Sequence, residues 1–151
     1  MKRKAIVCDI DGVLLDSSHI MQEAEDLELY GDLKWDYFYN HCNDNSVKII
    51  ESGKIFYNLI RYGVNSNICF IFSTARNEKC SDSTLKRLAF ESIFCDRIYM
   101  RKDGDLRPSY EVKREHLLKI MEEFDIVAFI DDDIENCKMA KGLGILSLRV
   151  V

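Results

Sequence analysis

The stretch Lys4-Ala5-Ile6-Val7-Cys8-Asp9-Ile10-Asp11-Gly12, near the start of the 151-residue chain, decides the fold. It is a short apolar run that ends in two acids, as expected of a buried strand with polar groups at its carboxyl end. Gly12 suits a tight turn directly after the strand. If the strand continues through Asp11, the side chains of Asp9 and Asp11 point to the same side. Two carboxylates so placed repel each other unless a cation lies between them.

Four further apolar runs follow, separated by segments with helical periodicity. They cover residues 67–73, 97–100, 125–130 and 144–151. Strands that are apolar on both sides are what a parallel sheet covered by helices requires. The order of elements therefore predicts an α/β fold: a doubly wound, Rossmann-like parallel sheet of five strands, with helices on both faces and a short helical insert after the first strand.

Capping residues and apolar spacing place the helices. Pro108 suits the first turn of a helix that continues to Phe124, and residues 81–90 and 134–141 form shorter helices. In the insert, about residues 17–66, we expect a helix from Asn43 or Asp44 to Gly63, and residues 17–39 also look helical with poorer periodicity. A chain of this length fits one domain, 1–151, with a single core.

The composition, 47% hydrophobic and 31% charged residues, is that of an ordinary globular protein. No apolar run approaches the roughly 20 residues of a membrane span, and the basic N-terminus leads into too short an apolar stretch for a signal peptide. We therefore expect a cytoplasmic protein with no membrane partner, in which the six scattered cysteines stay reduced. The net charge of −5 argues against a surface that coats nucleic acid, although residues 97–114 are locally basic.

Polar side chains follow several of the strands. Ser73, Thr74 and Arg76 come after the second run, and the acids at 131–133 come after the fourth. Ligands of open α/β sheets bind at the carboxyl ends of the strands, so we expect these groups to meet Asp9 and Asp11 at one edge. A divalent cation such as Mg²⁺ would relieve the repulsion between the acids and would create a site for phosphate.

These residues resemble the motifs of a known family. Asp9-Ile10-Asp11-Gly12-Val13-Leu14 matches the DxDG(V/T)L motif of the haloacid dehalogenase-like (HAD) phosphohydrolases. Phe72-Ser73-Thr74-Ala75-Arg76 looks like their second motif, and Phe129-Ile130-Asp131-Asp132 like their fourth; the third motif is a lysine. The motifs occur in the family's order over nearly the whole chain. The resemblance implies an HAD-type phosphatase, that is, a phosphoric monoester hydrolase.

A closer resemblance lies in residues 100–113. This segment is similar to the pattern R-x-x-x-D-x-R-x-D-x-x-V-K of the 3′-phosphatase domain of bacteriophage-type polynucleotide kinases. Ser109 stands where that pattern has an Asp, and the chain contains no G-x-x-x-x-G-K-[ST] kinase loop. The resemblance implies a substrate with a nucleic-acid 3′-phosphate end, or a nucleotide. It leaves open the oligomeric state and the existence of a separate kinase partner.

The resemblance also implies roles for single residues. Asp9 attacks phosphorus to form an aspartyl-phosphate, and Asp11 protonates the leaving oxygen and then activates water. Thr74 would hold a phosphoryl oxygen. Lys113 would neutralise charge at the reacting group; Lys102 is the alternative lysine. The Mg²⁺ ligands implied are Asp9, Asp11 through its backbone carbonyl, Asp131 and Asp132.

Two arginines and an aromatic group bear on the substrate. Arg76 and Arg107 are candidates for contacting substrate phosphate, because the guanidinium matches phosphate oxygens. The insert carries Tyr30, Trp35, Tyr37, Phe38 and Tyr39, which either anchor it to the core or stack on a base. Two alternatives to a nucleic-acid phosphatase stay open: a phosphatase for a small metabolite such as a sugar phosphate, and a non-catalytic member that only binds Mg²⁺ or a partner.

Overall fold

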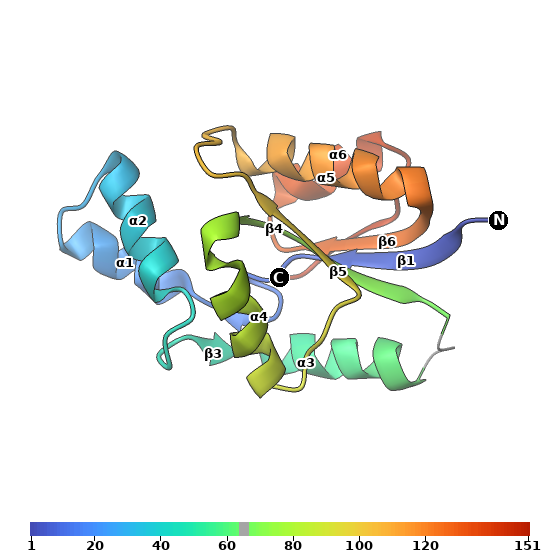
Figure 1. The fold of residues 1–151 in the computed structure, drawn as a ribbon, viewed down its shortest axis with the longest axis horizontal. Helices are drawn as coiled ribbons and strands as arrows, with labels where there is room; N and C mark the ends of the chain where they lie inside the picture. The colour runs from blue at the N-terminus through green and yellow to red at the C-terminus, as the bar shows by residue number, and fades with distance from the viewer. Residues whose placement is uncertain (64–66) are drawn as a thin grey trace.

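Five parallel strands form the centre of the computed structural model, which describes residues 1–63 and 67–151 (Figure 1). Their order is β5–β4–β1–β6–β7. Strand β1 therefore lies in the middle, with β4 and β5 on one side and β6 and β7 on the other. The predicted doubly wound, five-stranded sheet is confirmed. The strands are β1 (Arg3–Cys8), β4 (Cys69–Asn77), β5 (Arg97–Arg101), β6 (Phe124–Asp131) and β7 (Ser147–Arg149).

Helices cover both faces of the sheet (Figure 1). On one face, Leu117 and Ala140 belong to a buried cluster with the inward side chains of β1, β4 and β6. On the other face, Tyr57 and Leu88 pack in a second cluster that includes Phe70. The predicted helices at 81–90, after Pro108 and from Ile134 are confirmed. The covering helices are α5 (Ser109–Glu123) and α6 (Ile134–Gly142) on the first face, and α3 (Glu51–Asn58) and α4 (Ser81–Phe90) on the second.

None of the helices within 1–63 and 67–151 combines the length and the apolar character needed to cross a bilayer.

The insert between β1 and β4 contains more than helices. Helices α1 (Ser18–Asp26) and α2 (Gly31–His41) form a lobe beside the end of the sheet (Figure 1). The segment 17–39 is thus two helices, and Glu28 and Gly31, with φ angles of 54° and 56°, lie at the break between them. The last three residues of the predicted insert, 64–66, lie outside the described residues.

The predicted helix from Asn43 or Asp44 to Gly63 is wrong in its first part. Residues Lys48–Ile49 form strand β3, which pairs antiparallel with β2 (Leu15–Asp16). The reason is local: Val47 is buried and Lys48 is exposed, an alternation with the period of a strand, and β2 offers a partner for its backbone. The helix begins only at Glu51, as α3, and continues as the π-helical turn η1 (Leu59–Gly63).

The turn after β1 separates the two acids of the first motif. The strand ends at Cys8, and Gly12 adopts a φ of 78°, so the strand does not continue through Asp11. Gly53 of α3 packs so closely against this turn that a Cβ there would lie 1.9 Å from the carbonyl oxygen of Val13. The turn is therefore held by a helix that the chain reaches only about 40 residues later.

Candidate active site

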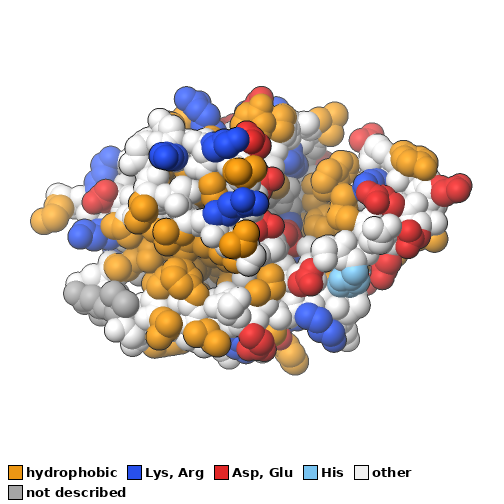
Figure 2. Space-filling view, turned by 180° about the vertical axis from the view of Figure 1, so that it is seen from behind, with side chains coloured by type: hydrophobic (Ala, Val, Ile, Leu, Met, Phe, Trp, Pro, Cys, Tyr) orange, Lys and Arg blue, Asp and Glu red, His pale blue; other side chains and the backbone are white. Residues whose placement is uncertain are grey.

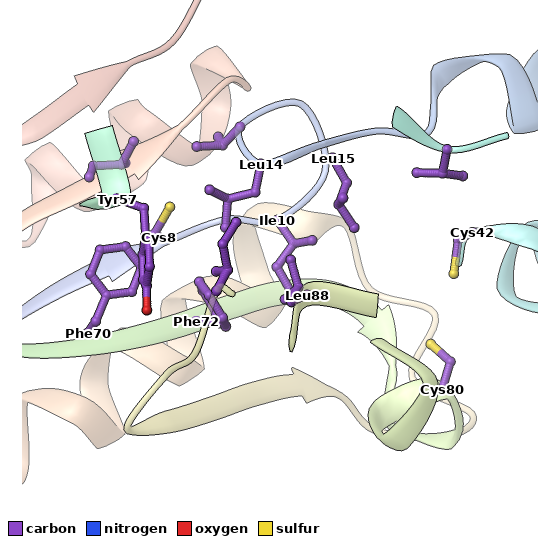
Figure 3. Close-up of a cluster of buried hydrophobic side chains, with 14 of the residues drawn as sticks. Cys8, Ile10, Leu14, Leu15, Cys42, Tyr57, Phe70, Phe72, Cys80 and Leu88 are labelled. Atoms are coloured by element: carbon purple, nitrogen blue, oxygen red, sulfur yellow. The ribbon is translucent and has the colours of Figure 1, made fainter. Parts of the chain in front are cut away.

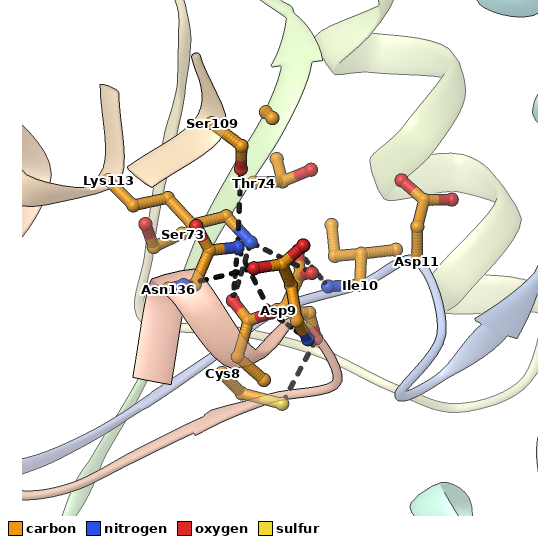
Figure 4. A network of polar contacts seen from close by, with 12 residues as sticks. Cys8, Asp9, Ile10, Asp11, Ser73, Thr74, Ser109, Lys113 and Asn136 are labelled. Carbon is orange, nitrogen blue, oxygen red and sulfur yellow. Dashed lines mark hydrogen bonds and ion pairs between the residues drawn. The ribbon is translucent and has the colours of Figure 1, made fainter. Parts of the chain in front are cut away.

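The centre of the site is a buried ion-pair group formed by Asp9, Lys113 and Asp131. Lys113 Nζ lies 2.8 Å from Asp9 Oδ2 and 2.6 Å from Asp131 Oδ2. Asp9 directly follows β1, Asp131 ends β6, and Lys113 projects from the first turns of α5. Figure 4 shows the Lys113 side chain extending toward Asp9. The lysine is 1% exposed, so its charge acts in an environment with little screening by water.

Further hydrogen bonds hold the two acids in place. Asp9 Oδ1 accepts from the backbone N–H of Ile10 at 2.8 Å. Both oxygens of Asp131 lie within 3.2 Å of Asn136 Nδ2, and the N–H of Asp133 donates to Asp131 Oδ1 at 3.0 Å. Asp133 itself caps α6 by accepting from two backbone N–H groups of the first turn, as its position before the helix predicts. These contacts orient the carboxylates before any substrate arrives.

Asp11 belongs to a second group, built around Arg76 on β4. Arg76 donates to both carboxylate oxygens of Asp11, at 2.9 and 2.7 Å, in a bidentate pair. Its other N–H groups donate to Asn43 Oδ1, to Thr84 Oγ1 and to the Cys42 carbonyl oxygen. All five guanidinium donors are therefore directed at protein acceptors. Figure 4 shows the Asp11 carboxylate turned away from the group around Asp9.

The two acids of the first motif differ in protonation behaviour as a result. Burial raises the pKa of Asp9 well above its usual value; Asp131 and Asp11 raise it further and only Lys113 opposes them. Burial also raises the pKa of Asp11, but the charge and hydrogen bonds of Arg76, with a bond from Ser17, outweigh it and lower the pKa overall. The bidentate arginine thus keeps Asp11 ionised in this arrangement.

The donor set fits a hard divalent cation. Asp9, Asp131 and Asp132 each offer an oxygen atom, and these atoms all lie within 4.8 Å of one another. Burial and the charge of Asp131 raise the pKa of Asp132. Lys113 supplies one positive charge against three carboxylates, so a cation would reduce their repulsion. Carboxylate oxygens in a partly open group are what Mg²⁺ prefers.

A cavity of about 480 Å³ opens above Asp9, between the sheet and the lobe of α1 and α2. Figure 2 shows the hollow between the lobe and the body of the protein, with acidic and apolar side chains around it. Trp35, Phe38 and Tyr39 of α2 line the lobe side, and we refer to them as the aromatic wall. The rings of Trp35 and Tyr39 stack with centroids 6.1 Å apart, and Tyr39 is tied to the core through a 3.5 Å hydrogen bond to the Ala75 carbonyl oxygen.

The remaining residues predicted from the sequence lie in different surroundings. Thr74 is fully buried in β4, and its hydroxyl accepts from the backbone N–H of Arg76. Arg107 pairs with Asp105 and Glu115, each at 2.7 Å, beside a neighbouring cavity. Lys102 is exposed and pairs with Glu78 at 3.0 Å, whereas Lys113 lies against Asp9.

Sequence reasoning missed several supporting residues. Asn136 Nδ2 donates a hydrogen bond to Asp131. Ser17 donates to Asp11 Oδ1 at 2.6 Å, and Asn43 Oδ1 accepts from Arg76 at 2.6 Å. Only Ser17 carried a signal, because it follows the first motif closely in sequence. Asn136 and Asn43 become neighbours of the site through α6 and the insert, and no local pattern marks them.

Comparison with known families identifies the chain. The model of the HAD superfamily, subfamily IIIB (acid phosphatase), matches residues 1–142. The chain therefore belongs to this family, and the resemblance drawn from its motifs is confirmed. No protein with a curated function matches the sequence significantly.

Solved structures share the fold at low sequence identity. A chain of the Pnkp1/Rnl/Hen1 RNA repair complex superposes with a TM-score of 0.76 and 18% identity, over 99% of this chain and 42% of that one. A class C acid phosphatase from Bacillus anthracis with tungstate bound gives 0.65 and 20%, over 90% and 54%. A haloacid dehalogenase-like hydrolase from Streptococcus pneumoniae gives 0.68 and 14%, over 97% and 84%. The chain thus spans less than half of the repair-complex chain.

Proposed function

We propose that the protein hydrolyses phosphomonoesters through an aspartyl-phosphate on Asp9. The observation that carries this proposal is the placement of Lys113 between Asp9 and Asp131, at the carboxyl ends of β1 and β6. A buried ammonium at this position opposes the effect of burial on the pKa of the carboxylate nucleophile and meets the charge that develops on the transferring phosphoryl group. The position of Lys102, paired with Glu78 on the surface, supports the choice of Lys113 as the catalytic lysine.

The reaction proceeds in two displacements. Asp9 attacks phosphorus and the ester oxygen leaves with a proton from Asp11; Asp11 then removes a proton from the water that hydrolyses the aspartyl-phosphate. Asp11 is ionised in the resting arrangement, which is the form needed for the second step. For the first step it must take up a proton. The Thr74 hydroxyl donates a hydrogen bond to a phosphoryl oxygen in this proposal, which requires that the phosphate reach past the cavity lining to the buried end of β4.

Arg76 acts in this proposal chiefly by positioning Asp11. Because its five donors all meet protein acceptors, a contact with the substrate phosphate requires that one of these bonds be exchanged. Arg107 reaches substrate only if the bound molecule extends past the aromatic wall into the neighbouring cavity, which Trp35 and Tyr39 also line.

Mg²⁺ fits the oxygen donors of Asp9, Asp131 and Asp132, together with the backbone carbonyl of Asp11. When bound, it would neutralise carboxylate charge and polarise the phosphate for attack. The residues of this chain that orient these ligands are Asn136, through Asp131, and Lys113.

The aromatic wall supports a substrate that carries a nucleobase, as in a nucleotide or a nucleic-acid 3′-phosphate end. Trp35 is 46% exposed and lines the cavity that contains Asp9, so its ring is available to a second flat group. Phe38 is buried and serves the alternative role of anchoring the lobe.

One observation favours a smaller substrate with a single phosphate. Acids line both cavities: Asp16, Asp132 and Asp133 around the first, and Asp103 and Asp105 around the second. They would repel the backbone of a polynucleotide.

The experiment that separates the candidate substrates compares kcat/KM for a 3′-phosphorylated oligonucleotide, a nucleoside 3′-monophosphate and a sugar phosphate, each with Mg²⁺. Preference for the oligonucleotide supports a nucleic-acid end, and preference for the sugar phosphate supports a metabolite.

Asp9→Asn tests the nucleophile. We expect kcat to fall by on the order of 10⁴-fold or more, because the amide cannot attack phosphorus. The substitution leaves Lys113 paired with Asp131, so the melting temperature should not fall. A folded Asp9→Asn protein that retains its activity would exclude this mechanism.

The wild-type protein tests whether the chain is an enzyme at all. If the folded protein hydrolyses neither an aryl phosphate nor a nucleotide with Mg²⁺, a phosphatase function is excluded, and a non-catalytic Mg²⁺-binding member of the fold is favoured.

Trp35→Ala tests the aromatic wall. If a base stacks on this ring, kcat/KM for the nucleotide falls by about 5- to 150-fold, the equivalent of about 1–3 kcal/mol, and that for the sugar phosphate does not change. Leu33→Ala is the matched control, because Leu33 lies on the same helix, is 63% exposed and is not part of the wall. An equal loss for both substrates would assign Trp35 to anchoring the lobe.

A further inference from the structure

Two cysteines face each other where the α1–α2 lobe joins the core. Cys42 directly follows α2, and Cys80 ends the 3₁₀ turn η2 (Glu78–Cys80) that follows β4. Their sulfur atoms point toward one another and lie within reach of a side-chain hydrogen bond (Figure 3). Both thiols are free in the structure. A disulfide between them would join the lobe to the core.

Only one of the two thiols can be reached from solvent. Cys80 lines a surface cavity of about 330 Å³, together with Tyr39, Asn77 and Lys79. Cys42 is fully buried behind it, with its Sγ 3.6 Å from the Tyr39 carbonyl oxygen. A small oxidant that enters the cavity meets Cys80 first.

The surroundings of the pair also make the two thiols unequal. The hydrogen bond from Cys42 lowers the pKa of Cys80 to about 7; burial opposes this, while the Thr84 hydroxyl and the Arg76 charge add to it. The same bond to Cys80, together with burial, raises the pKa of Cys42. The pair thus combines a thiol with a lowered pKa and a second thiol that can resolve its oxidation product.

We propose that Cys80 and Cys42 form a peroxide-sensitive disulfide that restrains the site through Arg76. The Cys80 thiolate attacks hydrogen peroxide, the O–O bond breaks, and Cys80 becomes a sulfenic acid as hydroxide leaves. The Cys42 thiol then attacks the oxidised sulfur; the S–S bond forms and water leaves with the thiol proton. Two thiols are oxidised and one peroxide is reduced to two molecules of water.

The link to the site passes through the backbone at Cys42. Arg76 NH2 donates to the Cys42 carbonyl oxygen at 3.1 Å, and NH1 donates to the side chain of the next residue, Asn43. A disulfide draws the two sulfurs to about 2.05 Å, and in this proposal the Cys42 backbone takes up part of the movement. The shift disturbs Arg76, which holds both oxygens of Asp11. This consequence rests on the proposed function of Asp11, whereas the disulfide itself does not.

The other cysteines provide an internal comparison. Cys8 and Cys69 lie on strands inside the core, and burial raises the pKa of Cys8. Cys95 is half-buried, and burial raises its pKa to about 11. Cys137 is half-buried with a raised pKa as well. Cys80 should therefore react before the remaining thiols.

Peptide mapping of the whole protein tests the disulfide directly. After brief treatment of the folded wild-type protein with hydrogen peroxide, we expect a Cys42–Cys80 cross-linked peptide, the loss of two of the six thiols, and full reversal by dithiothreitol. Cys80→Ser and Cys42→Ser should abolish the cross-link, and Cys95→Ser should retain it. Oxidation of Cys95 or Cys137 while Cys80 stays reduced would overturn the proposal, and so would a Cys80 that is oxidised without joining Cys42.

Activity provides the second measurement. Oxidised wild-type protein should show a kcat lowered by up to about 100-fold, because a misplacement of an acid–base group by about 1 Å can cost that much. Dithiothreitol should restore it, and Cys80→Ser should be insensitive to peroxide. A cross-link without any change in kcat would refute the restraint on the site. A protein without phosphatase activity that still forms the cross-link would contradict the proposed function alone.

Discussion

Lys113 is the residue on which the charges of the site depend. It is the one ammonium that contacts both Asp9 and Asp131 within the described ranges, and its own pKa is raised by these two acids although burial opposes this. A buried charge of this kind stabilises the fold only while its partners are present. The same residue therefore contributes to stability and, in the proposed mechanism, to catalysis.

Lys113→Met should destabilise the protein by about 3–5 kcal/mol, because it leaves two buried carboxylates without their cation. Mg²⁺ should recover part of this loss, and it should raise the melting temperature of the variant more than that of the wild-type protein. Thermal unfolding with and without MgCl₂ measures both effects. Lys102→Met is the control: its exposed ion pair with Glu78 is screened by solvent and should contribute little to stability. Equal stabilisation of both variants by Mg²⁺ would contradict a cation site next to Lys113.

Arg76 shows how a motif residue acquires its role from its neighbours. The sequence places it two positions after Thr74 and predicts a phosphate contact. The structure surrounds it with Asp11, Asn43, Thr84 and the Cys42 carbonyl, which come from three separate segments. No pattern of residue spacing in the sequence predicts that all five guanidinium N–H donors of Arg76 have protein acceptors.

At the scale of elements, α3 and the turn after β1 depend on each other. Gly53 allows the helix to approach the Val13 carbonyl, and Leu14 pairs with Ile50 through a 2.8 Å backbone hydrogen bond. The clash that a Cβ would cause involves backbone atoms, which cannot rotate away. The position of Asp11 therefore depends on a residue more than 40 positions further along the chain.

Gly53→Ala should lower the free energy of unfolding by about 1–3 kcal/mol or more, because either the helix or the turn must move. Chemical denaturation measures the loss, and kcat should fall with it as Asp11 shifts. Gly142→Ala, in the last turn of α6 with open space around it, is the matched control and should be neutral or slightly stabilising. A Gly53→Ala protein as stable as the wild type would show that the turn adapts freely.

At the scale of the whole molecule, His116 joins α5 to two strands of the sheet. Its Nε2 donates to the Met100 carbonyl oxygen at 3.2 Å, so Nδ1 of the neutral ring accepts from the Ser73 hydroxyl at 2.9 Å. Burial lowers the pKa of His116 to about 4, from an ordinary value of 6.5. The folded protein therefore holds this ring neutral.

This shift makes stability depend on pH. Below pH 6.5 the unfolded chain takes up a proton that the folded chain refuses, so stability is complete above pH 6.5 and is lost progressively down to about pH 4. The loss amounts to about 3 kcal/mol. His116→Gln should remove this part of the pH dependence in denaturation curves measured at pH 7 and pH 4.5. An identical pH dependence in both proteins would mean that other groups cause it.

The sequence by itself determined the five strands of the main sheet, three of the helices that cover it and the family, because apolar runs and the first motif are local features. It also predicted that Asp9, Thr74 and Asp131 lie at one edge of the sheet, since parallel strands end together, and the family resemblance indicated Lys113. Tertiary structure alone decided the partners of these residues. Lys48–Ile49 became a strand because β2 lay beside it, Asn136 reached Asp131 through the turn of α6, and Cys42 met Cys80 where the lobe returns to the core. Such contacts join segments that are distant in the chain, and the physical reason is that their geometry exists only once the layers have packed.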